Sequence, residues 1–114
     1  MPGDRLRRVN QAVRQVLSDA ITKDLKDPRV GFVTVTAVDV SPDLRQAHVY
    51  VSVLGDAAAR EGSVEGLDAA HGFLQRRIAR ELRLKHTPTL AFEIDDSADR
   101  GLRISQLIDR ELGE

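Results

Sequence analysis

The sequence predicts an α+β fold in which helices pack on one face of a three-stranded sheet. Three observations carry this prediction: an amphipathic helical pattern opens the chain, two extended stretches rich in β-branched residues follow, and two more helical patterns separate these from a third alternating stretch. A last amphipathic pattern closes the chain, so the predicted order is α-β-β-α-α-β-α. The 114 residues contain no repeat, linker or low-complexity tract, and we therefore expect one domain over residues 1–114.

The first helix is predicted from apolar residues that recur at steps of three and four. They are Leu6, Val9, Val13, Leu17, Ile21 and Leu25. Asp27-Pro28 should end this helix, because proline disfavours helical geometry in the residue before it.

Two strands are predicted next. Residues 33–40 are rich in β-branched side chains, and the turn residues 41–43 end this stretch. Residues 47–53 alternate strictly between apolar and polar side chains, so the odd positions should face a core. The side chains on the opposite face are His48, Tyr50 and Ser52. We expect the two strands to form an antiparallel hairpin.

Two consecutive helices are predicted before the third strand. The first covers residues 56–70, where Gly62 and Gly66 predict an irregular start and a regular part from about Ser63. The second runs through Leu84, with apolar and basic residues on opposite sides. Its apolar side carries Leu74, Ile78 and Leu82, and its basic side Arg76, Arg80 and Arg83. Arginines in such a row suit backbone phosphates, although a charged face that merely aids solubility is the simpler interpretation.

The end of the chain predicts a strand and a helix. Thr87-Pro88 breaks the basic helix, and alternation at Leu90, Phe92 and Ile94 predicts the third strand. Residues 95–97 resemble an N-cap cluster for the last helix. That helix would carry Leu102, Ile104, Leu107, Ile108 and Leu112.

Charge is segregated along the chain although the net charge is only −1. Two segments are basic: residues 1–30 hold seven Lys and Arg and four Asp, and residues 72–86 hold five Lys and Arg and one Glu. Two segments are acidic: residues 39–71 hold two Arg and six Asp and Glu, and residues 87–114 hold three Arg and seven Asp and Glu. A molecule with cations on two helical segments and anions elsewhere should dock on a polyanion in one orientation.

Two helices between the second and third strands match the βααβ core of a KH domain in its bacterial arrangement. No Gly-x-x-Gly loop joins the helices, and Ala70-His71-Gly72 stands in its place. A glycine between two helical patterns indicates a kink or a close backbone approach, or else a tolerated packing residue. The kink interpretation predicts that Gly72→Val harms folding or binding more than Gly66→Val.

The chain resembles the ribosome-binding factor A family from Arg5 to Leu112. Any one of the shared motifs is weak, but their joint occurrence in order and at family spacing is specific. They include Arg8-Val9, Asp27-Pro28-Arg29, Thr34-Val35-Thr36, Val49-Tyr50-Val51-Ser52, Leu54-Gly55, Ala70-x-Gly72-Phe73-Leu74-x-Arg76 and Pro88-x-Leu90-x-Phe92.

This resemblance implies a KH-like domain in which an Ala-x-Gly kink at Ala70, His71 and Gly72 replaces the usual loop. It also implies binding to free or immature 30S small ribosomal subunits through 16S rRNA, with a role in late maturation, in 16S rRNA processing and in growth in the cold. The implied RNA-binding residues are Arg76, Arg77, Arg80, Arg83 and Lys85, with Arg5, Arg7, Arg8 and Arg14 as extensions. Longer family members carry a C-terminal extension, whereas this chain ends in residues 111–114, which include the acidic Glu111 and Glu114.

Enzymatic functions find no support in the residues. The three histidines show no metal-ligand spacing, there is no phosphate-binding glycine loop, and the sequence has no cysteine. We therefore expect no catalysis, no cofactor, no metal, no small-molecule substrate and no membrane partner. We also expect a cytoplasmic protein, because residues 1–5 lack the apolar segment of a signal peptide. As a separate expectation, the protein is a monomer in solution.

One alternative function stays open at this point. A non-enzymatic protein-interaction adaptor would use the exposed strand face around Tyr50 or the acidic last helix, and its arginines would serve solubility only. Salt separates the two hypotheses, because phosphate binding weakens steeply with added salt and a mostly apolar contact does not.

Overall fold

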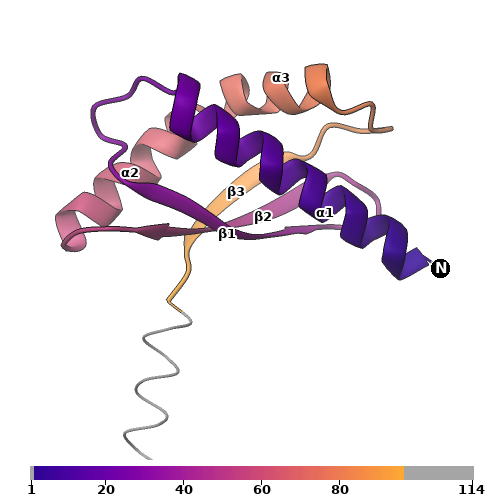
Figure 1. Cartoon of the computed structure of the whole chain (residues 1–114), viewed down its shortest axis with the longest axis horizontal. Coiled ribbons are helices and arrows are strands. Elements are labelled where there is room, and N and C mark those ends of the chain that lie inside the picture. The colour runs from indigo at the N-terminus through magenta and orange to yellow at the C-terminus, as the bar shows by residue number, and fades with distance from the viewer. Residues whose placement is uncertain (1, 97–114) are drawn as a thin grey trace, which may run out of the picture.

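The computed structural model describes residues 2–96 and confirms the α+β fold class (Figure 1). Its elements are α1 (Pro2–Asp19), the π-helical turn η1 (Ala20–Asp24), β1 (Val33–Val40), β2 (Gln46–Val53), α2 (Ala57–Ala69), α3 (His71–Glu81) and β3 (Thr89–Ile94). The predicted last helix lies outside the described residues. Within residues 2–96, no helix is long and apolar enough to cross a membrane.

The sheet has the strand order β1-β2-β3, with β2 antiparallel to β1 and parallel to β3. The hairpin prediction is therefore confirmed. The parallel pairing follows from α2 and α3, which together form the crossover between β2 and β3. The helices lie on one side of the sheet (Figure 1).

The core lies between the helices and this sheet. In β2, Ala47, Val49 and Val51 are fully buried, whereas His48 and Ser52 are exposed on the other face, as the alternation predicts. Buried residues of all three helices complete the core, and they include Val13, Leu17, Leu67, Leu74 and Ile78.

A bulge in β1 changes which face its side chains occupy. Val35 pairs with Val51 and Ala37 with Tyr50, so Thr36 is an extra residue that the register leaves without an opposite residue on β2. Its hydroxyl donates a hydrogen bond to the Asp95 carboxylate, with 2.6 Å between the two oxygens. The buried positions consequently shift from the odd residue Val35 to even-numbered residues after the bulge.

The first helix ends earlier than its apolar pattern predicts. Regular α-helix stops at Asp19, a π-helical turn covers Ala20–Asp24, and Leu25 is extended. The wider turn still buries Ala20 and Ile21. Apolar spacing alone does not distinguish a π-helical turn from an α-helical one, because both place residues three to five positions apart near one another.

Helix α2 begins where predicted, but it is regular from Ala57, so the expectation of an irregular start was wrong. The Asp56 side chain caps the helix by accepting a hydrogen bond from the Ala59 backbone N–H at 2.8 Å. This satisfies one of the free N–H groups of the first turn and fixes the helix start six residues before Ser63.

Helix α3 ends at Glu81, so its predicted extension through Leu84 was wrong. Leu82 has extended backbone angles (φ −118°, ψ 131°). Leu82 and Leu84 are both half-buried, while Arg83 and Lys85 are exposed. Such alternation suits an extended chain, which can place both leucines against the core.

Candidate nucleic-acid interface

The outer side of α3 carries two exposed arginines. Arg76 and Arg80 are four residues apart, so they lie about 40° from each other around the helix. Leu74 and Ile78 are fully buried on the opposite side and hold the helix on the core. The arginines therefore face solvent from a helix whose position is fixed by packing.

Two more cations follow the end of the helix. Arg83 and Lys85 are exposed on the extended segment that Leu82 and Leu84 anchor. Because Arg83 lies beyond the helix, its predicted place in a helical row was wrong. We call Arg76, Arg80, Arg83 and Lys85 the basic surface. Among residues 2–96, none of these four has a carboxylate within ion-pair distance.

Arg77 differs from its neighbours, although the family resemblance grouped it with them. Its side chain is only 15% exposed, and its Nη2 lies 2.6 Å from Oδ2 of Asp24. The guanidinium also lies over the Phe73 ring, 5.5 Å from the ring centroid. The ion pair ties α3 to η1, and the ring contact holds the guanidinium on α3, so Arg77 has a structural role whether or not it contacts a ligand.

The four arginines of α1 do not form a single patch with the basic surface. Arg5 and Arg14 are nine residues apart, which places them about half a turn apart around the helix. Arg5 shares a groove with Lys85, whereas Arg14 lines a shallow depression beside Thr34 of β1. Arg7 and Arg8 are exposed on the same helix. Only Arg5 is thus shown to lie beside the basic surface.

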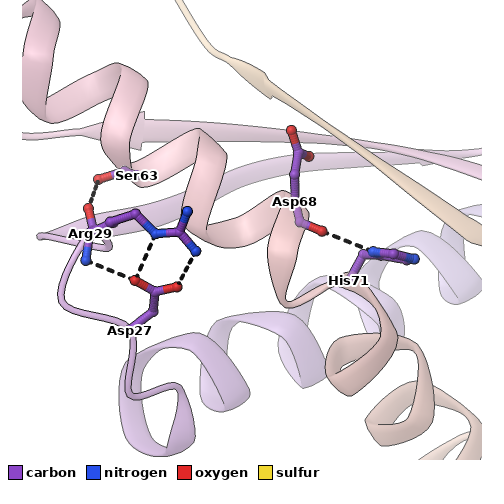
Figure 2. A network of polar contacts seen from close by, with 5 residues as sticks. All are labelled: Asp27, Arg29, Ser63, Asp68 and His71. Carbon is purple, nitrogen blue, oxygen red and sulfur yellow. Dashed lines mark hydrogen bonds and ion pairs between the residues drawn. The ribbon is translucent and has the colours of Figure 1, made fainter.

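The junction between α2 and α3 is made by Ala70. This residue has φ −91° and ψ 6°, and its N–H donates to the carbonyl oxygens of Gly66 and Leu67 at 3.1 Å. The His71 side chain donates from Nδ1 to the Asp68 carbonyl oxygen at 2.9 Å (Figure 2). Both contacts satisfy carbonyl groups at the end of α2.

Gly72 lies in the first turn of α3, and its φ is not positive. A Cβ atom at this position would meet only Nη1 of Arg76, at 3.5 Å, which is ordinary contact. The junction therefore does not need glycine for backbone freedom at residue 72.

Gly66 is the glycine that packing requires. A Cβ atom there would lie 2.6 Å from Cγ2 of Val30 and 3.4 Å from the Asp27 carboxyl group. The segment before β1 passes directly over α2 at this point. The expected order of the two valine substitutions is consequently reversed, because Gly66 is the close backbone approach that the sequence pattern placed at Gly72.

Two residues beside the basic surface were missed in the sequence. Arg45 and His86 line the same groove as Arg5 and Lys85. The parallel register brings them together, since the Thr89 N–H donates to the Arg45 carbonyl oxygen at 2.9 Å. The predicted crossover between the second and third strands was the signal that could have placed them at one end of the sheet. No cluster of three metal-ligating side chains occurs in the described part of the chain.

The fold and this surface define a KH-like α+β domain with an exposed row of cations at the end of its crossover. Comparison with known proteins makes this more specific. The chain belongs to the ribosome-binding factor A family, whose model matches residues 5–108.

Individual relatives agree with this assignment. Ribosome-binding factor A of Geobacter sulfurreducens is 46% identical over 105 residues, which cover 92% of this chain and 89% of that protein. The crystal structure of ribosome-binding factor A from Thermus thermophilus superposes with a TM-score of 0.70 at 29% identity, covering 78% of this chain and 94% of that one. A homology model of the Thermus thermophilus protein, fitted into a cryo-EM map of its 30S complex, gives a TM-score of 0.64 at 30% identity over 76% of this chain and 91% of that one.

Proposed function

We propose that this protein is a non-enzymatic assembly factor that binds free or immature 30S subunits through 16S rRNA. It supports late maturation of the subunit, including 16S rRNA processing, and thereby growth in the cold. It acts in the cytoplasm. The proposal is supported by family membership and by the 30S complex of the Thermus thermophilus relative.

The observation that carries the proposal is the basic surface itself. Four exposed cations stand on a helix and segment that the core holds in place, and no carboxylate in residues 2–96 lies within ion-pair distance of them. Exposed arginines with fixed positions can form paired hydrogen bonds to phosphates without reorganising the protein. The Thr89–Ile94 strand and the α2 helix, by contrast, expose mainly acidic or neutral side chains.

The protein is proposed to act by occupying its binding site on the rRNA. A folded domain bound to rRNA holds one arrangement of the RNA and leaves when maturation removes its site. No bond is made or broken, so the binding free energy and the change in the RNA account for the whole effect.

Cosedimentation tests this function directly. The purified protein should sediment with free 30S subunits and much less with 50S subunits or assembled ribosomes. Each phosphate contact should add about 0.7–0.9 to the slope of log affinity against log salt concentration. Equal binding to 50S subunits would refute the proposal, and an affinity indifferent to salt would favour the protein-interaction adaptor.

A further inference from the structure

A groove of about 790 Å³ lies where the start of α1, the β1–β2 turn and the segment after α3 meet. Its volume is within the range of about 300–1,000 Å³ that is usual for pockets holding a small ligand. Its lining combines apolar and cationic side chains. The apolar ones are Leu6, Val9, Pro42 and Leu44, the cationic ones are Arg5, Arg45 and Lys85, and the His86 imidazole lies beside them.

The apolar lining is held by an unusual backbone. Leu44 has φ +62° and is the only non-glycine residue in the described range with a positive φ. This conformation costs roughly 1–2 kcal/mol for a residue with a branched side chain. Glycine or asparagine would adopt it more readily, but neither would place an apolar side chain at the groove.

The turn that holds Leu44 is strongly fixed. The Leu44 N–H donates to the Ser41 carbonyl oxygen at 2.8 Å, and the Gln46 N–H donates to Ser41 Oγ at 3.0 Å. The half-buried Leu44 side chain packs beside the core. Strain that is maintained in this way beside a cavity is an indication of function.

The charge of the groove is positive. Its lining includes one carboxylate, Asp43, which accepts hydrogen bonds from Ser41 Oγ at 2.6 Å and from the Arg45 N–H at 3.1 Å. Arg45 Nε lies 3.9 Å from the same carboxylate, so these two charges offset each other. Arg5 and Lys85 have no such partner among residues 2–96 and leave the groove cationic.

We propose that this groove holds one unstacked nucleotide of single-stranded RNA, with its base against Leu44, Leu6 and Val9 and its phosphate between Arg5 and Lys85. This inference rests on the proposed function, because Lys85 also belongs to the basic surface. That continuity favours RNA over an acidic peptide, since one RNA strand can run from the basic surface into the groove. A base-paired duplex does not fit this chemistry, because its base faces are stacked.

Two RNA probes of equal charge test the groove. Fluorescence anisotropy would compare a labelled adenosine hexamer with a hexamer of abasic riboses, both binding to the full chain. The wild-type protein should bind the adenosine hexamer about tenfold more tightly, which corresponds to burying roughly 50–60 Å² of apolar surface. Equal affinities for the two probes would overturn the proposal, as would displacement of the adenosine hexamer by an acidic peptide at equal concentration.

The decisive variant is Leu44→Asn. Asparagine tolerates positive φ but removes the apolar wall, so the preference for the base should fall to about twofold, with the abasic affinity unchanged. Leu54→Asn is the matched control, because Leu54 is 77% exposed at the opposite end of β2 and should keep the wild-type preference. A preference unchanged in Leu44→Asn would also overturn the assignment.

The test separates this inference from the proposed function. If the protein cosediments with 30S subunits but shows no preference for the base, the proposed function stands and the nucleotide-binding groove is refuted. If it prefers the base but does not bind 30S subunits, the groove assignment stands and the proposed function is refuted. If Leu44→Asn fails to fold, the two wild-type affinities still decide between the outcomes. The amide chemical shifts of Leu6 and Val9 in the wild-type protein should then also change when the adenosine hexamer is added, and unchanged shifts would overturn the proposal.

Discussion

Arginines have opposite roles in two regions of this molecule. In the junction region, defined as residues 20–30 with α2 and the inner side of α3, Arg29 and Arg77 form ion pairs with Asp27 and Asp24 at 2.8 and 2.6 Å. On the basic surface, Arg76 has no carboxylate partner in the described part of the chain. Arg76 and Arg77 are neighbours in the sequence, so the number of charges in a segment does not reveal which cations are available to a ligand.

The difference has a physical origin in helix geometry. Successive residues on α3 point about 100° apart, so Arg76 turns to solvent while Arg77 turns toward η1. A partly buried cation needs a partner, because leaving it unpaired costs several kcal/mol at full burial. An exposed cation needs none and keeps its hydrogen-bond donors for a phosphate.

The largest expected effect comes from reversing charge on the basic surface. Changing Arg76, Arg80 and Arg83 together to Glu replaces phosphate contacts with repulsion, so affinity for 30S subunits should fall by about 100-fold or more at low salt. The free energy of unfolding should change little, since exposed charges contribute about 0–1 kcal/mol each. Cosedimentation and urea unfolding measure the two quantities, and the variant should fail to rescue a deletion strain in the cold.

The matched control for the triple variant reverses charge elsewhere. Asp39 on the open face of the sheet and Glu61 on α2 are both exposed. Changing them to Lys should leave 30S binding at or slightly above the wild-type level. If the folded triple variant binds like the wild type, the interface lies elsewhere, and α1 around Arg5 would be the next candidate.

The second prediction compares two glycines and reaches into the junction region. Gly66→Ala should destabilise the protein by about 1–3 kcal/mol, because its Cβ atom would lie 2.6 Å from Val30 and the packing there must open. Gly72→Ala should be neutral or stabilise the helix by up to about 1 kcal/mol. Thermal and urea unfolding of the two variants would give the order, and the opposite order would mean that α2 can move away from Val30 at little cost.

The glycine pair shows what the sequence could and could not predict. Local patterns were sufficient for the strict alternation of β2 and for the opposite sides of α3. Close approaches between distant segments leave no local signal, so the contact of Gly66 with Val30, 36 positions earlier, was invisible. The ion pair of Asp24 with Arg77 also could not be predicted, because no spacing pattern relates the two residues. Nor does any local pattern indicate the bulge at Thr36.

The candidate site was predictable to a similar degree. Clustered charge pointed to α3 and the segment after it, because the cations there outnumber the anions over a short stretch. The groove required the positions of three separate elements. Arg45 follows a turn, and nothing in the sequence around it indicates that Arg45 and Lys85 line the same groove.

The third prediction tests the inner side of α3. Arg77→Ala removes the ion pair with Asp24, the contact with the Phe73 ring and the packing of the aliphatic stem, so it should cost about 1–2 kcal/mol of stability. Binding of the folded protein to 30S subunits should stay within about threefold of the wild type. A double-mutant cycle with Asp24→Ala would isolate the pair, and additive effects would show that the two side chains do not interact in solution. If Arg77→Ala instead weakens binding as much as Arg76→Ala does, the division between the two regions is wrong.

The smallest effect should be a pH dependence in the junction region. Asp27 Oδ1 accepts hydrogen bonds from the N–H and Nε of Arg29 at 2.9 and 3.1 Å, and Oδ2 accepts from Nη2 at 2.8 Å (Figure 2). The side-chain hydrogen bond from Arg29 lowers the pKa of Asp27 below its usual value of 3.8. A lowered pKa in the folded state means that the carboxylate stabilises the fold above pH 3.8, and that this contribution is lost as the pH falls through the lowered value.

Asp27→Asn keeps an oxygen acceptor for Arg29 but removes the charge. The variant should therefore be slightly less stable than the wild type near neutral pH, and the difference should shrink as the pH falls below about 4. Urea unfolding at a series of pH values measures this, with Asp39→Asn as the control, because Asp39 is exposed and has no ion pair within residues 2–96. The size of the effect is limited because Arg29 is 47% exposed, where water screens the pair. A difference that stays constant down to pH 2 would show that the Asp27 charge does not stabilise the loop, and the hydrogen bonds of Ser63 to Arg29 and Gly31 would then hold the loop on α2.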